Sequence, residues 1–157
     1  MQLTRFTDFS LRVLIYLGMH PDRLATISEI AEAYRVPRNH LMKVVHQLAV
    51  LGYVETVRGN GGGMRLARNP SLITLGAVVR DVEENLDVLD CFDFRSKEVD
   101  CPLLPACVLR SVLMRARDNF LSTLDGVTLR DLLPDSKDPK FLWPSRASGR
   151  APQHSGS

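Results

Sequence analysis

The feature that most constrains this chain is a glycine run, GNGGG at residues 59–63, between two short segments with strand character. The segments are YVETVR (53–58) and MRLAR (64–68), and glycines at the connection permit the positive φ angles that a tight turn requires. We therefore expect a β-hairpin over 53–68. Because helical patterns dominate the sequence on both sides of it, the predicted fold class is mostly α.

Three helices are expected before the hairpin. The first covers about 8–19, and in the second Thr26 and Glu29 have the spacing of a capping box. The third covers 38–51, where apolar residues recur three and four apart, and Gly52 stops it. A short helix, a tight turn, a longer helix and a glycine-tipped hairpin together indicate a winged helix-turn-helix, with the hairpin as its wing.

This arrangement predicts binding to double-stranded DNA. The first turn of such a third helix meets base edges in the major groove, and a cation beside a slender wing tip can enter the minor groove. Residues 1–70 also carry nine Lys and Arg against five Asp and Glu, as suits a polyanionic partner. The alternative is a protein-interaction module, a role that winged helices also serve. The candidate DNA-contacting residues are Arg38, Asn39, His40, Lys43, Arg58, Asn60 and Arg65.

Further helices are expected after the wing. Thr74 caps a helix over 75–84, a long helix covers 108–124, and a short helical turn covers 129–133. The long helix has more apolar surface than a lone small domain can cover, so we expect it to pair with its twin in a homodimer. A two-fold dimer would hold two third helices about 34 Å apart, one turn of DNA. The apolar stripe comprises Leu109, Val112, Leu113, Ala116, Phe120 and Leu124.

All three cysteines of the chain, Cys91, Cys101 and Cys107, lie in the polar segment 91–107. Their surroundings lack the periodic apolar pattern of buried thiols, and the start of a helix at Cys107 favours the thiolate that metals bind. Structural zinc prefers cysteine pairs with two to four residues between them, whereas iron–sulfur clusters accept looser spacing and a non-cysteine ligand. The spacing C-x9-C-x5-C therefore favours an iron–sulfur cluster, with zinc and the absence of a metal as alternatives.

These patterns divide the chain into four parts. We predict a DNA-binding domain over 1–84, a cluster-binding loop over 85–107, a dimerisation helix and C-terminal turn over 108–133, and a disordered tail over 134–157. No apolar run approaches the ~20 residues of a membrane span, so we expect no membrane association and a cytoplasmic location. No phosphate-binding loop or catalytic triad is apparent, so we do not expect an enzyme.

Four motifs resemble the IscR/NsrR family of winged-helix iron–sulfur transcriptional regulators. The resemblance runs from residue 1 to about residue 133. The motifs are MQLTRFTDFSLRVLIYL (1–17), ISEIAEAYRVPRNHLMKVVHQL (27–48), GYVETVRGNGGGMRLAR (52–68) and CPLLPAC (101–107). Within the family, RNHLMKVV, VRGNGGGMRL and the C-x5-C spacing are most similar to the nitric-oxide-sensitive repressors.

The resemblance implies a homodimeric repressor of nitrosative-stress genes that senses nitric oxide. It implies a [2Fe-2S] or [4Fe-4S] cluster held by Cys91, Cys101 and Cys107, with the partner subunit's Asp8 as candidate fourth ligand. Asp8 would otherwise be an acid favoured by the start of its helix. Other family members carry a histidine ligand three residues after the last cysteine, where this chain has Arg110, and the stretch between Cys91 and Cys101 is longer than the family pattern.

Two alternatives to nitric-oxide sensing are retained. The first is a regulator of the same fold that responds to iron–sulfur or redox status. The second, from another functional class, is a zinc-bearing protein-interaction module.

Overall fold

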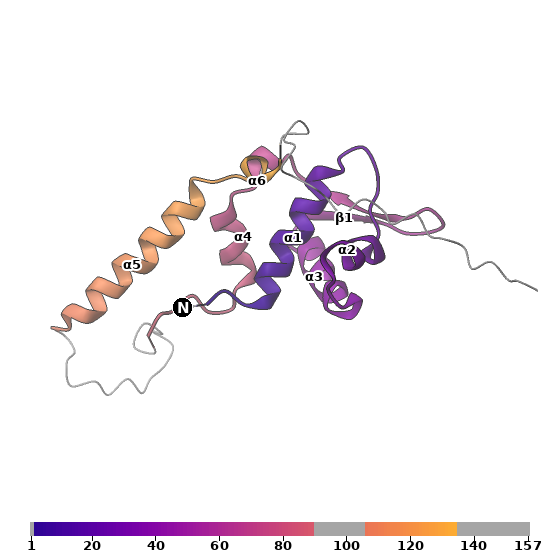
Figure 1. Ribbon diagram of the computed structural model, residues 1–157. Coiled ribbons are helices and arrows are strands. Elements are labelled where there is room, and N and C mark those ends of the chain that lie inside the picture. Colours follow the sequence, from indigo (N-terminus) through magenta and orange to yellow (C-terminus); the bar gives the residue numbers. More distant parts are fainter. Residues whose placement is uncertain (1, 90–105, 135–157) are drawn as a thin grey trace, which may run out of the picture.

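The computed structural model describes residues 2–89 and 106–134 and has the predicted mostly helical architecture (Figure 1). A two-stranded antiparallel sheet follows the first three helices, as the glycine run indicated. The elements are α1 (Arg5–Met19), α2 (Ile27–Tyr34), α3 (Arg38–Val50), β1 (Val54–Val57), β2 (Gly63–Leu66), the 3-10 helix η1 (Pro70–Leu72), α4 (Leu75–Val82), α5 (Val108–Asp125) and α6 (Leu129–Leu132).

Helix α1 is the centre of the hydrophobic core and contacts α2, α3, α4, α6 and strand β2. Its fully buried side chains, Val13 and Leu14, meet Leu41 and Leu48 of α3 in one cluster. Burying each such aliphatic side chain contributes about 1.5–3 kcal/mol, so this cluster fixes α3 against α1.

Local chemistry at the helix ends explains where two helices depart from the predicted bounds. Helix α1 begins at Arg5 rather than near residue 8, because the Thr4 hydroxyl accepts a hydrogen bond from the Thr7 amide (3.3 Å). Helix α4 ends at Val82 rather than at residue 84, because Glu83 takes an extended conformation (φ −84°, ψ 125°). The predicted capping box at the start of α2 is confirmed.

The turn from α3 into the wing is as predicted. Helix α3 ends at Val50, Leu51 caps it, and Gly52 has the positive φ (73°) of a residue just past a helix. The strands are shorter than the predicted 53–58 and 64–68. In the register, Val54 lies opposite Leu66 and Val57 opposite Gly63.

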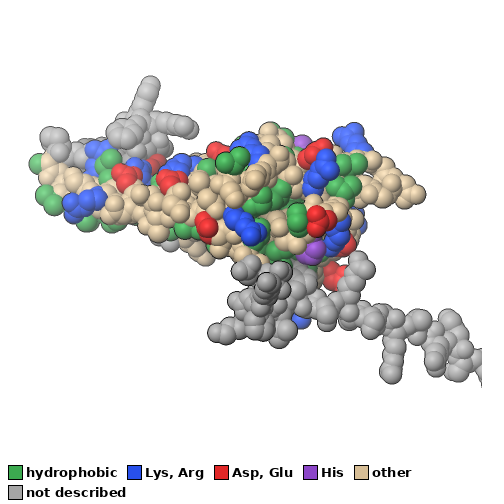
Figure 2. Space-filling view, turned by 90° about the horizontal axis from the view of Figure 1, so that it is seen from above, with side chains coloured by type: hydrophobic (Ala, Val, Ile, Leu, Met, Phe, Trp, Pro, Cys, Tyr) green, Lys and Arg blue, Asp and Glu red, His purple; other side chains and the backbone are tan. Residues whose placement is uncertain are grey.

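Helix α5 contacts the rest of the chain at its C-terminal end and, through an ion pair of Arg117 with Asp87 (3.2 Å), near its middle, while its N-terminal part extends away from the body (Figure 1). The Arg80 guanidinium donates two hydrogen bonds of 2.6 Å to the Asp125 carboxylate, and the Leu75 amide donates to the Val127 carbonyl (2.9 Å). Hydrophobic side chains gather at the opposite, free end of the molecule (Figure 2). No residue of α5 is buried within the described part of this chain.

Several predicted features lie outside the described residues. They are Cys91, Cys101, most of the 85–107 loop and the tail from residue 135. The four-part division therefore stays a prediction. None of the helices within 2–89 and 106–134 is long and apolar enough to span a membrane.

Candidate DNA-reading surface and cysteine site

Helix α3 separates a buried face from an exposed one. Its apolar residues Leu41, Val44, Val45 and Leu48 are buried, while Arg38, Asn39, His40 and Lys43 are all exposed in its first two turns. Pro37 precedes the helix, and no side chain caps this end. The start of α3 therefore presents cationic and amide side chains together with backbone N–H groups, the donors that suit base edges and phosphates.

His40 also contacts helix α1. Its ring stacks on Phe9, with 6.3 Å between the ring centroids and 28° between the planes. Phe9 directly follows Asp8, the candidate cluster ligand. The contact therefore joins the first turn of α3 to the turn of α1 that carries Asp8.

The wing exposes Arg58 and Asn60 at a tip made mostly of glycine. Arg65 is exposed as well, but its Nε donates to the Glu55 carboxylate (2.9 Å) across the two strands. This hydrogen bond raises the pKa of Arg65 and offsets its charge. Arg58 makes no ion pair with any residue in the described ranges, so it is the wing cation best placed to meet a phosphate.

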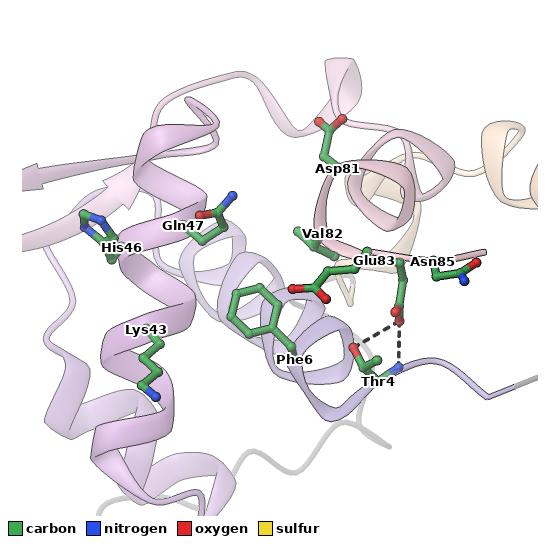
Figure 3. Close-up of a pocket in the computed structure, with 10 residues that line it drawn as sticks. Thr4, Phe6, Lys43, His46, Gln47, Asp81, Val82, Glu83 and Asn85 are labelled. Atoms are coloured by element: carbon green, nitrogen blue, oxygen red, sulfur yellow. Dashed lines mark hydrogen bonds between the residues drawn. The ribbon is translucent and has the colours of Figure 1, made fainter. Parts of the chain in front are cut away.

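A pocket lies where α3, the start of α1 and the end of α4 meet (Figure 3). Glu83 is buried there, and its carboxylate accepts hydrogen bonds from the Thr4 amide (2.6 Å) and the Thr4 hydroxyl (3.2 Å). Nearby, Asp81 accepts a 2.6 Å hydrogen bond from the Tyr53 hydroxyl. Burial, and then this bond, raise the pKa of Tyr53. The lining residues are Thr4, Phe6, Lys43, His46, Gln47, Asp81, Val82, Glu83, Glu84 and Asn85.

The roles of Glu83 and Asp81 were not predicted from the sequence. Thr4 and Glu83 are 79 positions apart, so no local pattern connects them. The available signal was weak: an apolar residue, Val82, precedes Glu83 at the end of a strongly amphipathic helix.

The structure describes two of the four candidate cluster ligands. Cys107 is half-buried at the start of α5, where its sulfur accepts a hydrogen bond from the Arg110 amide (3.4 Å). The Asp8 side chain is 47% exposed and accepts a hydrogen bond from Arg12 Nε (2.8 Å). A cysteine at a helix N-terminus and an accessible carboxylate are both able to ligate iron, so these residues fit the predicted donor set.

The described residues do not bring a complete metal site together within one chain. In ranges 2–89 and 106–134, no three His, Cys, Asp or Glu side chains converge in a way that could hold a metal ion. Cys91 and Cys101 fall outside these ranges, so the predicted ligand set stays a prediction.

Comparison with known proteins assigns the family. The family model described as Rrf2, an iron-dependent transcriptional regulator, matches residues 3–135. The chain belongs to the Rrf2 family. Its Rrf2 relatives are transcriptional regulators, in agreement with the expectation that the chain is not an enzyme.

Two curated Rrf2 relatives carry the name HTH-type transcriptional regulator NsrR. The protein from Bacillus subtilis is 48% identical over 88% of this chain and 94% of its own length. The one from Geobacillus kaustophilus is 45% identical over 93% of this chain and 99% of its own length. The resemblance to NsrR within this family is therefore confirmed by relatives of that name that match almost end to end.

Solved Rrf2 structures confirm the winged-helix fold. T. potens IscR aligns with a TM-score of 0.70 over 90% of this chain and 93% of its own, at 24% identity. CymR, described as the global cysteine regulator of B. subtilis, aligns with a TM-score of 0.67 over 84% and 95%, at 26% identity. With the relatives' names, this fold makes the chain a DNA-binding transcriptional regulator.

Proposed function

We propose that this Rrf2 protein is a homodimeric repressor that binds operator DNA in the cytoplasm and releases it when nitric oxide reacts with an iron–sulfur cluster. The single observation that carries the proposal is the near end-to-end similarity to NsrR proteins, at 45–48% identity. The position of Cys107 at the start of α5 and the accessible Asp8 carboxylate support it.

The DNA is bound by the start of α3 and by the wing. Arg38, Asn39 and Lys43 contact base edges and phosphates in the major groove, where each good bidentate pair contributes about 1–3 kcal/mol of discrimination. Arg58 and Asn60 follow the adjacent backbone or minor groove. His40 is held against Phe9 and acts at the edge of this surface. Arg65 contributes less than Arg58, because Glu55 offsets its charge.

Dimerisation takes place through α5. In the single chain, Val108, Leu109 and Val112 are 75%, 57% and 44% exposed. Exposing neighbouring apolar side chains to water is unfavourable, and such patches mark interaction surfaces. Pairing α5 with its twin covers these side chains. In such a dimer the partner subunit's Asp8 would complete the ligand set, as the family resemblance implies.

The cluster, when bound, supplies iron with which nitric oxide can react. Cys91, Cys101 and Cys107 would hold it, and of these Cys107 lies at the start of α5. Asp8 transmits the change, because Phe9 beside it stacks on His40 at the start of α3. The buried Glu83 keeps the start of α1 in position through Thr4, so a shift of the loop after α4 also reaches α1.

The proposal is tested with protein purified without oxygen. We expect iron, acid-labile sulfide and visible absorption in the unmodified chain, tight operator binding, and loss of both absorption and binding on addition of nitric oxide. Parallel additions of oxygen and of an iron chelator separate nitric-oxide sensing from sensing of redox or iron status.

Two variants sharpen this test. Cys107→Ala should lose the cluster and the response to nitric oxide while keeping its helical circular dichroism. The control Ser122→Ala, at an exposed position further along the same helix, should behave as the unmodified chain. A colourless unmodified protein that contains zinc, or a Cys107→Ala variant that still responds to nitric oxide, would overturn the proposal.

A further inference from the structure

The exposed face of α3 contains one large apolar side chain among polar ones in its first three turns. Met42 is 54% exposed. It lies one turn after Arg38 and one turn before His46, on the same strip of the helix, and directly precedes Lys43. Met42 is therefore on the surface proposed to enter the major groove.

Met42 has no packing role in the described part of the chain. The α3 residues that reach the core are Leu41, Val44, Val45 and Leu48, and Met42 is absent from the core and from the side chains packed on it. A single exposed apolar residue is ordinary on a protein surface. On a DNA-reading helix, however, it faces a groove in which apolar groups are rare.

The C5-methyl group of thymine is the apolar group that base pairs present in the major groove. A polar side chain that binds the O4 acceptor of thymine would bind the same atom of uracil equally well. Such a contact therefore does not detect the methyl group. An apolar side chain can, and the unbranched, flexible methionine adapts readily to such a contact. Resting on the proposed function in DNA binding, we propose that Met42 reads a thymine methyl group in each operator half-site.

The test uses the full-length chain purified without oxygen and duplexes that it selects from a random-sequence library. In the selected duplex, each thymine is replaced in turn by deoxyuridine, which removes only the methyl group. Dissociation constants are measured by fluorescence anisotropy. At one thymine per half-site we expect about fourfold weaker binding, because a buried methyl-sized group contributes about 0.8 kcal/mol and 1.4 kcal/mol is tenfold.

The same duplexes are then measured with two variants. In Met42→Ala the thymine and deoxyuridine duplexes should bind equally well. The matched control is Val50→Ala, which removes another exposed apolar side chain (67%) at the far end of α3 and should keep the fourfold difference. Thermal unfolding of both variants checks that the fold is retained.

The possible failures are distinct. Tight binding without any sensitivity to deoxyuridine overturns the role of Met42 and leaves the DNA-binding function standing. Sensitivity that persists in Met42→Ala, or disappears in Val50→Ala as well, shows that another group reads the methyl. Failure to enrich any duplex overturns the proposed function and this inference together.

Discussion

At the scale of single residues, the buried carboxylate of Glu83 is the contact with the clearest energetic consequence. It accepts two hydrogen bonds from Thr4, which caps the start of helix α1. Glu83→Ala leaves a partly buried amide without this acceptor, so we expect the free energy of unfolding to fall by about 1–3 kcal/mol in urea denaturation at neutral pH.

The matched control is the exposed neighbour Glu84, for which replacement by alanine should change the unfolding free energy by less than about 0.5 kcal/mol. Equal losses in the two variants would contradict the role assigned to Glu83.

A pH dependence follows from Tyr34, where burial raises the pKa of the phenol to about 12. In the unfolded chain this phenol ionises near pH 10, so between about pH 10 and 12 the folded state binds more protons than the unfolded state. Stability from the neutral phenol is therefore complete below pH 10 and falls as pH rises toward 12. We expect Tyr34→Phe to lose less stability over this range than the unmodified chain, measured by denaturation at each pH. Parallel curves for the two proteins would contradict this.

The salt dependence of DNA binding tests whether Arg58, rather than Arg65, is the wing cation that contacts a phosphate. Arg58→Gln should lower the slope of log binding constant against log salt concentration by about one for each wing, because each phosphate contact releases about one counterion. The double variant Glu55→Gln/Arg65→Gln removes a pair that is already neutral overall and should leave the slope unchanged. A larger slope change in the double variant would mean that Arg65 leaves Glu55 to bind DNA.

At the scale of elements, the attachment of α5 to α4 depends on a close approach. A Cβ atom at Gly76 would overlap the Asp125 carboxylate, so glycine allows Asp125 to reach Arg80. Arg80→Gln should increase amide hydrogen exchange around residues 122–127, by less than about tenfold because the pair is solvent-exposed. Exchange in the wing serves as the internal reference, and an unchanged α5 would contradict the role of the pair.

Short-range sequence patterns predicted most of the helices and the hairpin. The features that the sequence did not predict are contacts between residues that are distant in the sequence or on different elements. The capping box at Thr26, the stop at Gly52 and the glycine run of the wing are short-range chemistry, and each has the predicted structure. The pairing of Arg65 with Glu55 follows from strand register, which sequence alone did not specify. The exposure of the polar side chains at the start of α3 could be predicted because helix periodicity sets it, whereas the Phe9–His40 contact depends on how α1 crosses α3.

At the scale of the whole molecule, the exposed apolar residues of α5 lead to a direct test of the oligomeric state. Val112→Glu places a charge among the exposed apolar residues of α5 and should give a monomer in analytical ultracentrifugation. Ser122→Glu, at an exposed position later in the same helix, should remain dimeric. A monomeric unmodified chain, or a Val112→Glu variant that stays dimeric, would rule out dimerisation through this face.

The ion pair between Arg80 and Asp125 holds the C-terminal end of α5 against α4, far from the end that carries Cys107. Helix α5 has 18 residues, so its Cys107 end lies about 27 Å along the helix from this ion pair. At that radius, a displacement of about 2 Å at the cysteine end corresponds to a rotation of only about 4° around the Arg80–Asp125 contact. In a dimer paired through α5, as proposed above, such a rotation would change the angle between the two α3 helices, and a stiff DNA duplex accommodates such a change poorly.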